Sequence, residues 1–368
     1  MAGLFSPIRL AGQELPNRIL VSPMCQYSAE DGQAVEWHFA HYGALANSGA
    51  AMLVVEATAV EERGRISLGD LGLYSDGCET ALRRVVDYAR RYGTTAMGVQ
   101  LAHAGRKASA HVPWAGGGPL GPDEGAWETI GPSALPFDEG WHMPHEMTAE
   151  DLESVKAAFV ASAERALRIG FDLIELHMAH GYLLHEFCSA VSNRRTDAYG
   201  GSAENRLRFP LEVAAAVRAV WPADRILGAR ITGSDWLDGA MTEDDAVRLA
   251  AALKEADLDY VCVSSGGISP QARVRIGPGY QVPFARRVKH GTGIATCAVG
   301  LIAAPAQAER LIAEGEADLV ALARGFLDNP HWGWAAAHEL GAEVRRPVQY
   351  ARAAPKLWPG AAISRDLD

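Results

Sequence analysis

Two histidines and a tyrosine stand close together in ELHMAHGYLLHEF, residues 175–187. His177 and His180 are three residues apart, and Tyr182 follows two further on, after a short apolar run typical of a buried strand. Two imidazoles could bind a metal ion, or they could donate hydrogen bonds to an oxygen that gains negative charge. In the second case Tyr182 would supply a proton. Either histidine alone would be interpreted as a loop residue satisfied by backbone groups.

A metal ion would need a third ligand, often a carboxylate. The nearest one, Glu175, should point away from Leu176 and its neighbours because side chains alternate along a strand. Thiolate ligation is not expected either, since the five cysteines form no CxxC pair, and their odd number argues against a complete disulfide framework. They are Cys25, Cys78, Cys188, Cys262 and Cys297.

A phosphate group could bind near Gly300 and near Arg324 with Gly325, which follow the last two apolar runs of the chain. The glycines of GTGIAT, residues 291–296, resemble a dinucleotide motif only in part, and they precede a strand where that motif should follow one. Arg230 ends another apolar run, where a permanent cation could face an electron-rich ring. Gln100 could give two directed hydrogen bonds to an amide-like edge.

Helix-like segments alternate with apolar runs and must position these residues. SVKAAFVASAERALRIGFDLIELHMA and AQAERLIAEGEADLVALAR each read as an amphipathic helix, a turn and a strand. Continuous apolar runs are typical of parallel strands covered on both faces. Eight occur, at 19–24, 52–59, 96–102, 173–178, 226–232, 259–264, 294–299 and 318–323. They predict an α/β fold, a (β/α)8 TIM barrel of about 250 residues plus loops, with an open doubly wound sheet as the alternative.

Capping boxes predict where two helices begin, because Thr148 precedes Asp151 by three residues and Thr242 precedes Asp245 likewise. The segment 105–146 has no helical period, so it is expected to be a long loop after the third strand, at the active-site face. Residues 1–340 are predicted to form one barrel domain, with 341–368 as a C-terminal extension at a subunit interface.

Charge and composition exclude several classes of protein. The net charge is −11 with both signs interspersed, so no nucleic-acid footprint is present. The start, MAGLFSPIRL, lacks the features of a signal peptide, and the uncharged run 291–308 is interrupted by glycines and a proline. We therefore expect a cytoplasmic protein with neither a membrane span nor a nucleic-acid partner.

Further stretches combine with these residues into a longer pattern: NRILVSPMCQYSAEDG, VVEATAV, QLAHAGRKAS, ARITGSDW, SSGG, AVGLI and ARGFLDNPHW. With ELHMAHGYLLHEF they are spread over residues 17–332 in an order that resembles the Old Yellow Enzyme family of flavin-dependent ene-reductases. The closest branch is the thermophilic-like one, which includes xenobiotic reductases. The resemblance implies a noncovalent FMN across the barrel mouth. It also implies NAD(P)H as the hydride donor, with NADPH expected rather than NADH. Substrates would be activated alkenes such as enones, enals and maleimides, with nitro compounds as a further class.

The resemblance also implies a role for each site residue. His177 and His180 would hold the carbonyl oxygen, flavin N5 would give a hydride to the β-carbon, and Tyr182 would protonate the α-carbon. Substrate contacts would come from Tyr27, Lys107 and Arg352. The cofactor would be bound by Pro23, Met24, Cys25, Ala57, Gln100, Arg230, Gly300, Ala323 and Arg324. Ala323 is a departure, because relatives often have glycine before this arginine.

The tail resembles the branch in its QYxR segment, Gln349 to Arg352, through which an arginine enters the neighbouring subunit's site. This implies a homodimer or homotetramer, whereas a solvated surface arginine is the alternative. Two other functions compete with the ene-reductase: a metal-dependent barrel hydrolase that uses the HxxH pair, and a non-catalytic flavin-binding protein.

Overall fold

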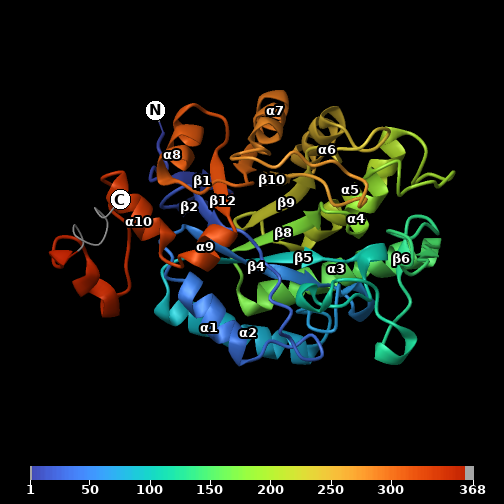
Figure 1. Cartoon of the computed structure of the whole chain (residues 1–368), viewed down its shortest axis with the longest axis horizontal. Coiled ribbons are helices and arrows are strands. Elements are labelled where there is room, and N and C mark those ends of the chain that lie inside the picture. Colours follow the sequence, from blue (N-terminus) through green and yellow to red (C-terminus); the bar gives the residue numbers. More distant parts are fainter. Residues whose placement is uncertain (1, 361–368) are drawn as a thin grey trace.

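A closed barrel of parallel strands forms the centre of the computed structural model, which describes residues 2–360 (Figure 1). Around the barrel the strand order is β10-β11-β12-β3-β4-β5-β8-β9. In chain order these strands are β3 (Ile19–Val21), β4 (Met52–Ala59), β5 (Ala96–Ala102), β8 (Leu173–Met178), β9 (Ile226–Thr232), β10 (Tyr260–Ser264), β11 (Ala295–Ala298) and β12 (Leu319–Leu322). All eight predicted strands are therefore confirmed, as is the TIM barrel, and the open sheet is wrong. The first strand ends before residue 24 because Pro23 has no N–H group to continue the ladder.

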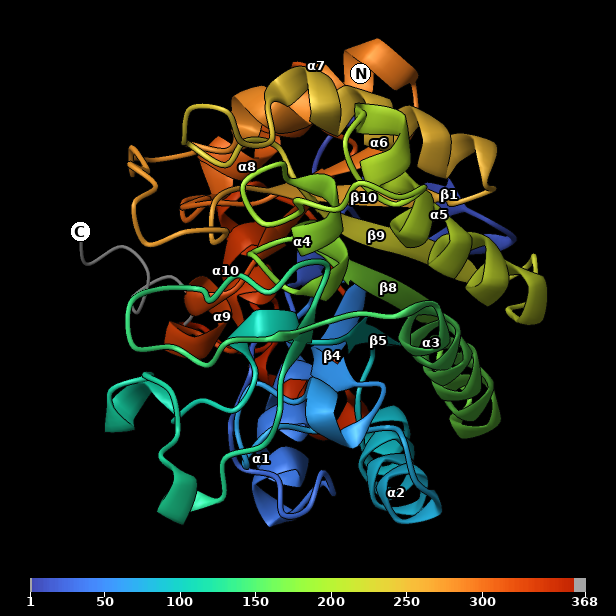
Figure 2. The ribbon, with the colours of Figure 1, turned by 90° about the vertical axis from the view of Figure 1, so that its right-hand side faces the viewer.

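Helices surround the barrel (Figures 1 and 2). They are α1 (Glu36–Leu45), α2 (Asp76–Tyr92), α3 (Ala149–Ile169), α4 (Leu183–Cys188), α5 (Ala203–Val220), α6 (Glu243–Glu255), α7 (Val282–Thr292), α8 (Pro305–Ala313), α9 (Arg324–Asp328) and α10 (Trp332–Glu339). Helix α3 begins at the predicted capping box, where Asp151 N–H donates to Thr148 Oγ1 at 3.2 Å and Thr148 N–H donates to Asp151 Oδ2 at 3.0 Å. The box of Thr242 and Asp245 at α6 is confirmed as well.

The apolar core has two parts, inside the barrel and between the barrel and its helices. Along β8, Leu176 belongs to the outer part, whereas Leu173 belongs to the inner one. A hairpin of β1 (Ile8–Leu10) and β2 (Gln13–Leu15) packs its leucines against the inner part. Hairpin and interior together hold the strands in register, so residues that follow the strands meet at one mouth.

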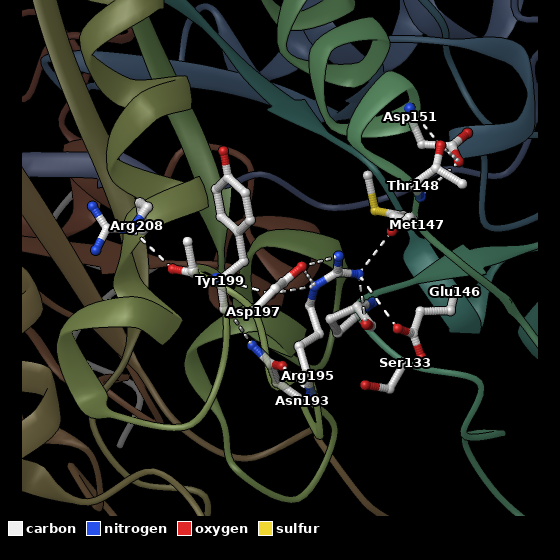
Figure 3. Close-up of polar contacts among 12 residues, drawn as sticks. Ser133, Glu146, Met147, Thr148, Asp151, Asn193, Arg195, Asp197, Tyr199 and Arg208 are labelled. Atoms are coloured by element: carbon white, nitrogen blue, oxygen red, sulfur yellow. Dashed lines mark hydrogen bonds and ion pairs between the residues drawn. The ribbon is translucent and has the colours of Figure 1, made fainter.

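The long segment after β5 contains three short 3-10 helices and the two-residue strands β6 (Ile130–Gly131) and β7 (His145–Glu146). In Figure 2 it is coloured cyan to green and lies on the side of the molecule that carries α4. Its returning end is fastened by Arg195, which donates to Pro132 O at 3.1 Å, to Met147 O at 2.7 Å and to the Asp197 carboxylate (Figure 3). The segment is thus a loop with a fixed base.

The C-terminal residues project beside α10, to the left in Figure 1. They form a 3-10 helix, Val348–Ala353, in which the Tyr350 ring lies 6.1 Å from the His331 ring and 6.0 Å from the Trp334 ring. Residues 361–368, the end of the predicted extension, lie outside the described residues. Among helices within residues 2–360, none has the length and apolar character needed to cross a membrane.

Candidate active site

The histidine pair lies where β8 ends, at the carboxyl-terminal mouth of the barrel. His177 is in register with Arg230 of β9, and His180 follows the strand with a positive φ of 61°. The two ring centroids are 5.1 Å apart at an interplanar angle of 86°, and His177 Nε2 lies 3.3 Å from His180 Nδ1. The Tyr182 ring centroid is 4.9 Å from that of His177. The structure therefore brings all three predicted catalytic side chains together.

Burial sets the protonation of these groups. Together with the Arg230 cation, it lowers the pKa of His177 and of His180 well below the usual value. Both rings are neutral near pH 7, so each has one N–H group to donate. Burial raises the pKa of the Tyr182 hydroxyl well above its usual value, so this group is protonated. Two neutral donors beside a protonated phenol suit the stabilisation of an oxyanion and the delivery of a proton.

Residues 179–182 are held by contacts from other loops. Gly181 N–H donates to His185 Nδ1 at 2.8 Å, and His185 Nε2 lies 3.1 Å from Asp235 Oδ1 in a fully buried pair. Glycine is required at 181, because its φ is +74° and a Cβ would lie 2.1 Å from Gly267 O. These contacts fix the turn between the second histidine and the tyrosine.

The ammonium group of Lys107 is directed to backbone carbonyls. Nζ donates to His180 O at 2.9 Å and to Gly267 O at 3.2 Å, and it lies 5.0 Å from the Tyr182 ring centroid. Burial lowers the pKa of Lys107 to about 8, although the Glu186 carboxylate acts in the opposite direction. Lys107 thus joins two loops at the mouth, and its role in substrate binding stays a prediction.

Arg230 presents an unpaired buried donor at the end of β9. Its Nη1 donates to Ser22 Oγ at 3.0 Å, whereas Nε is buried and, in the described part of the chain, has no hydrogen-bond partner. Burying a cationic N–H group without a partner is costly. This position is therefore suited to a polar group of a bound ligand.

One N–H of the Gln100 amide group is already used in a hydrogen bond within the protein. Its Nε2 donates to Glu175 Oε1 at 2.7 Å, and the Tyr260 hydroxyl donates to Glu175 Oε2 at 2.7 Å. Glu175 points away from Leu176, and it lies on the inner face of β8 with His177. Both Glu175 oxygens therefore already accept hydrogen bonds inside the barrel. Gln100 has one amide N–H group left for a ligand, rather than two.

Residues 23–27 cross the mouth after β3 and rest on a buried carboxylate. Gln26 N–H donates to Glu56 Oε2 at 2.6 Å, and the Tyr42 hydroxyl donates to Glu56 Oε1 at 2.9 Å. Burial raises the pKa of Glu56 to about 8. Pro23 and Met24, the first predicted cofactor contacts, belong to this supported backbone.

Cys25, Tyr27 and Ala57 occupy the same side of the site. Burial raises the pKa of the Cys25 thiol well above its usual value, and the nearby Asp70 and Glu56 carboxylates act in the same direction, so the thiol is protonated. Tyr27 has a φ of +50°, which is rare for a non-glycine residue, so the surrounding structure must hold its backbone in that conformation. Ala57 lines a small cavity together with Tyr182.

The predicted phosphate residues lie on neighbouring strands. Gly300 follows β11 with a φ of +113°, and Arg324 begins α9 directly after β12. Arg324 is exposed, and within residues 2–360 its guanidinium group has no hydrogen bond or ion pair. Ala323 stands at the first boundary of α9, as the N-cap residue. These three positions share one rim of the barrel, and phosphate binding there stays a prediction.

Arg352 lies apart from these residues in the single chain. It is exposed in the C-terminal 3-10 helix, which packs against α10 through Tyr350. No contact joins it to the histidine pair among the described residues. A role in the site of the same subunit is therefore not supported by the structure of one chain.

Sequence reasoning missed Ser264 and Trp114. Ser264 ends β10, and its Oγ lies 2.7 Å from His180 Nε2, although SSGG was recognised only as part of a pattern. Trp114, in the long loop, meets the Tyr27 ring edge-on at 5.8 Å. The position of Ser264 at the end of a predicted strand is the sequence signal that could have identified it as a site residue. His103, also at a strand end, instead bonds to Glu61 at 2.9 Å and supports a loop.

Metal ligands are not grouped around the histidine pair. Within the described ranges no set of three or more His, Cys, Asp or Glu side chains could hold a metal ion. The five cysteines are free thiols.

Comparison with known proteins gives a consistent result. Residues 3–343 match the sequence profile of the NADH:flavin oxidoreductase / NADH oxidase family. An NADPH dehydrogenase of Geobacillus sp. (strain WCH70) is 47% identical over 351 residues, which cover 95% of this chain and 98% of the relative. An NADPH dehydrogenase of Listeria innocua serovar 6a is 43% identical over 355 residues, covering 96% and 99%. The solved structure of morphinone reductase in complex with tetrahydroNAD is similar with a TM-score of 0.76 and 27% identity, over 94% of this chain and 93% of that one.

Proposed function

The chain belongs to the NADH:flavin oxidoreductase / NADH oxidase family, and from this premise we propose that it reduces the C=C bond of activated alkenes. It is an NAD(P)H-dependent flavin oxidoreductase with FMN as cofactor and NADPH as electron donor. The metal-dependent hydrolase and the non-catalytic flavin-binding protein are therefore wrong. We assign enones, enals, maleimides and nitro compounds as substrates, because each has an oxygen that the histidine pair can bind.

The residues at the barrel mouth fit FMN. The unpaired Nε of Arg230 and the remaining amide N–H of Gln100 can meet the polar edge of the flavin ring. Gly300, which allows a close approach of the backbone, and Arg324, an exposed cation, can meet its phosphate group. When bound, the cofactor supplies hydride transfer, from the nicotinamide and then to the β-carbon of the alkene.

The protein's own side chains handle the oxygen and the proton. His177 and His180 donate hydrogen bonds to the substrate oxygen and stabilise the negative charge that develops there. Tyr182 gives its proton to the α-carbon. Tyr27 and Lys107 border the substrate.

We further propose that the protein is a homodimer or homotetramer in which Arg352 enters the partner's site. The C-terminal segment exposes apolar side chains that a second subunit could cover. Their exposed fractions are 84% for Val348, 48% for Tyr350 and 66% for Leu357. Such a patch is typical of an interaction surface.

The observation that carries the ene-reductase proposal is the pair of neutral imidazoles with facing nitrogens beside Tyr182. Its test is the replacement of both histidines, His177→Ala with His180→Ala. We expect cyclohexenone reduction to slow by about 100-fold, because the developing charge loses its donors, while flavin content is retained. The exposed His290 of α7, changed to alanine, is the control. Unaltered cyclohexenone reduction in the double variant would refute the oxyanion role.

A further inference from the structure

The hydrogen bonds around the histidine pair run in one direction. Ala179 N–H donates to His177 Nδ1 at 3.3 Å, so the proton of the neutral His177 ring is on Nε2. This Nε2 faces His180 Nδ1 at 3.3 Å, so His180 accepts at Nδ1 and has its own proton on Nε2. That proton is donated to Ser264 Oγ at 2.7 Å. The Ser264 hydroxyl in turn donates to Gln281 Oε1 at 3.3 Å.

This arrangement leaves a single proton between the two facing ring nitrogens. An oxygen held by both histidines needs two N–H groups, one from each ring. His177 already has its proton on Nε2. His180 therefore has to change tautomer, from a proton on Nε2 to a proton on Nδ1. Its deprotonated Nε2 then needs a donor, because a buried acceptor without one is costly.

We propose that Ser264 is a positioning residue that sets the tautomer of His180, by turning its hydroxyl proton from Gln281 Oε1 to His180 Nε2 when the substrate oxygen binds. The inference rests on the proposed function and explains how both histidines become donors. The ring stays neutral, since one proton leaves Nε2 to water and another binds Nδ1 from water, while the serine O–H bond only rotates. Within residues 2–360, Ser264 is the only group hydrogen-bonded to this Nε2.

The position of Ser264 suits this task. It is the last residue of β10, in register with Thr232 of β9, and its exposed fraction is only 3%. The strand fixes the backbone, so the hydroxyl oxygen stays near His180 whichever way its proton points.

Gln281 keeps a donor when the Ser264 hydroxyl turns away. Ser265 Oγ donates to the same Gln281 Oε1 at 2.7 Å, and Gln281 Nε2 donates to Val299 O at 3.2 Å. Gln281 Oε1 therefore has a donor in either state. The adjacent serines of SSGG, residues 264–267, thus have different tasks: one acts on His180 and the other holds Gln281.

Nitrogen-15 NMR of the FMN-loaded enzyme, labelled at its histidines, reads the tautomer directly. The probe is 4-hydroxybenzaldehyde, a phenol whose oxygen stands in for the enolate oxygen. We expect His180, assigned with a His180→Gln variant, to change from Nε2–H to Nδ1–H as the probe saturates. A His180 that keeps its proton on Nε2 in the complex overturns the proposal, and this result needs no serine variant to fold. Probe binding that is unchanged when His177 or His180 is replaced would instead contradict the proposed oxyanion role itself.

Serine variants test the cause. Ser264→Ala should weaken probe binding about tenfold, the effect of one lost hydrogen bond, and should reduce the ligand-induced change of tautomer. Ser264→Thr keeps the hydroxyl and should restore both. Ser265→Ala is the matched comparison, because it removes a half-buried hydroxyl from the same Gln281 oxygen but leaves the Ser264 donor to His180, so it should weaken probe binding less than Ser264→Ala. Equal loss of affinity in the two alanine variants, with the His180 tautomer change intact, would assign the serines to structural support and contradict the proposal.

Discussion

At the scale of single residues, the site combines groups whose charge states are set by burial rather than by their usual pKa. His177 and His180 stay neutral because they are buried next to the Arg230 cation. In the proposed reaction, a substrate oxygen that becomes negative would therefore meet neutral imidazoles whose N–H groups can stabilise it. Burial disfavours the Tyr182 phenolate, so the hydroxyl keeps its proton and can supply it in the proposed protonation of the α-carbon.

Tyr182→Phe separates proton delivery from hydride delivery. The variant keeps the ring that packs against His177 but loses the acid. We expect the alkene half-reaction to slow by about 10²-fold or more, with some residual activity from solvent protons, since only this step protonates carbon. Reduction of the flavin by NADPH should change little. Stopped-flow spectroscopy of the two half-reactions makes the comparison, and equal slowing of both would indicate that Tyr182 only positions ligands.

At the scale of elements, loops rather than strands complete the site, and each is fastened by a buried polar group. Lys107 joins the turn after β8 to the loop after β10. Glu56 supports residues 23–27 after β3. Arg195 fastens the base of the long loop (Figure 3). Buried polar groups of this kind specify one loop arrangement but make it sensitive to charge.

Glu56 should make stability depend on pH. Burial raises its pKa in the folded protein to about 8, above the usual 4.5. A raised pKa means that the folded state binds the proton more tightly than the unfolded state. The contribution to stability is therefore full below pH 4.5 and is lost as the pH rises to about 8. We expect Glu56→Gln, which mimics the protonated acid, to lose less stability between pH 5 and pH 8 than the wild type, by about 3 °C in Tm.

Thermal unfolding at the two pH values measures this difference. Glu255→Gln, which removes an exposed carboxylate from α6, is the control and should follow the wild type. Parallel pH curves for wild type and Glu56→Gln would show that Glu56 does not titrate in this range.

Arg195→Lys should loosen the base of the long loop. Lysine has no planar fork with which to reach Pro132 O, Met147 O and Asp197 together, so we expect a loss of about 1–3 kcal/mol in local stability. Hydrogen exchange should accelerate in residues 130–148 and 193–201 and stay unchanged in the barrel strands. Arg208→Lys, a change at the exposed arginine that donates to Ala198 O, is the control. Faster exchange throughout the barrel would contradict a local role.

At the scale of the whole molecule, the barrel mouth of one chain lacks the predicted contribution of the tail. Arg352 is exposed, and its segment packs on α10 rather than on the histidine turn. A groove between α1, α2 and the tail is lined by Phe39, Tyr88, Tyr92 and Tyr350. Three of these aromatic side chains, Tyr88, Tyr92 and Tyr350, are exposed, which suits contact with a second subunit.

Arg352→Ala tests whether sites are completed between subunits. We expect weaker binding of substrate or nicotinamide, by about tenfold for the loss of one charged hydrogen bond, without a change in Tm. Mixing this variant with Tyr182→Phe under subunit exchange should restore part of the activity, because some sites then receive an intact arginine and an intact tyrosine. Absence of recovery, with exchange verified by mass spectrometry, would place Arg352 at the solvent surface.

The sequence by itself determined the barrel, its eight strands, the caps of α3 and α6, and the grouping of His177, His180 and Tyr182. These features depend on local periodicity and on short spacings, so they can be read along the chain. Only the tertiary structure decided the direction of Lys107, the pairing of Gln100 with Glu175, and the contact of Ser264 with His180. Those partners are 73, 75 and 84 residues apart, and side chains can be matched over such separations only after the barrel has brought the strand ends together. The tautomer of a histidine depends on such partners. The sequence therefore locates the histidines, whereas contacts made by the fold determine which ring nitrogen of each carries the proton.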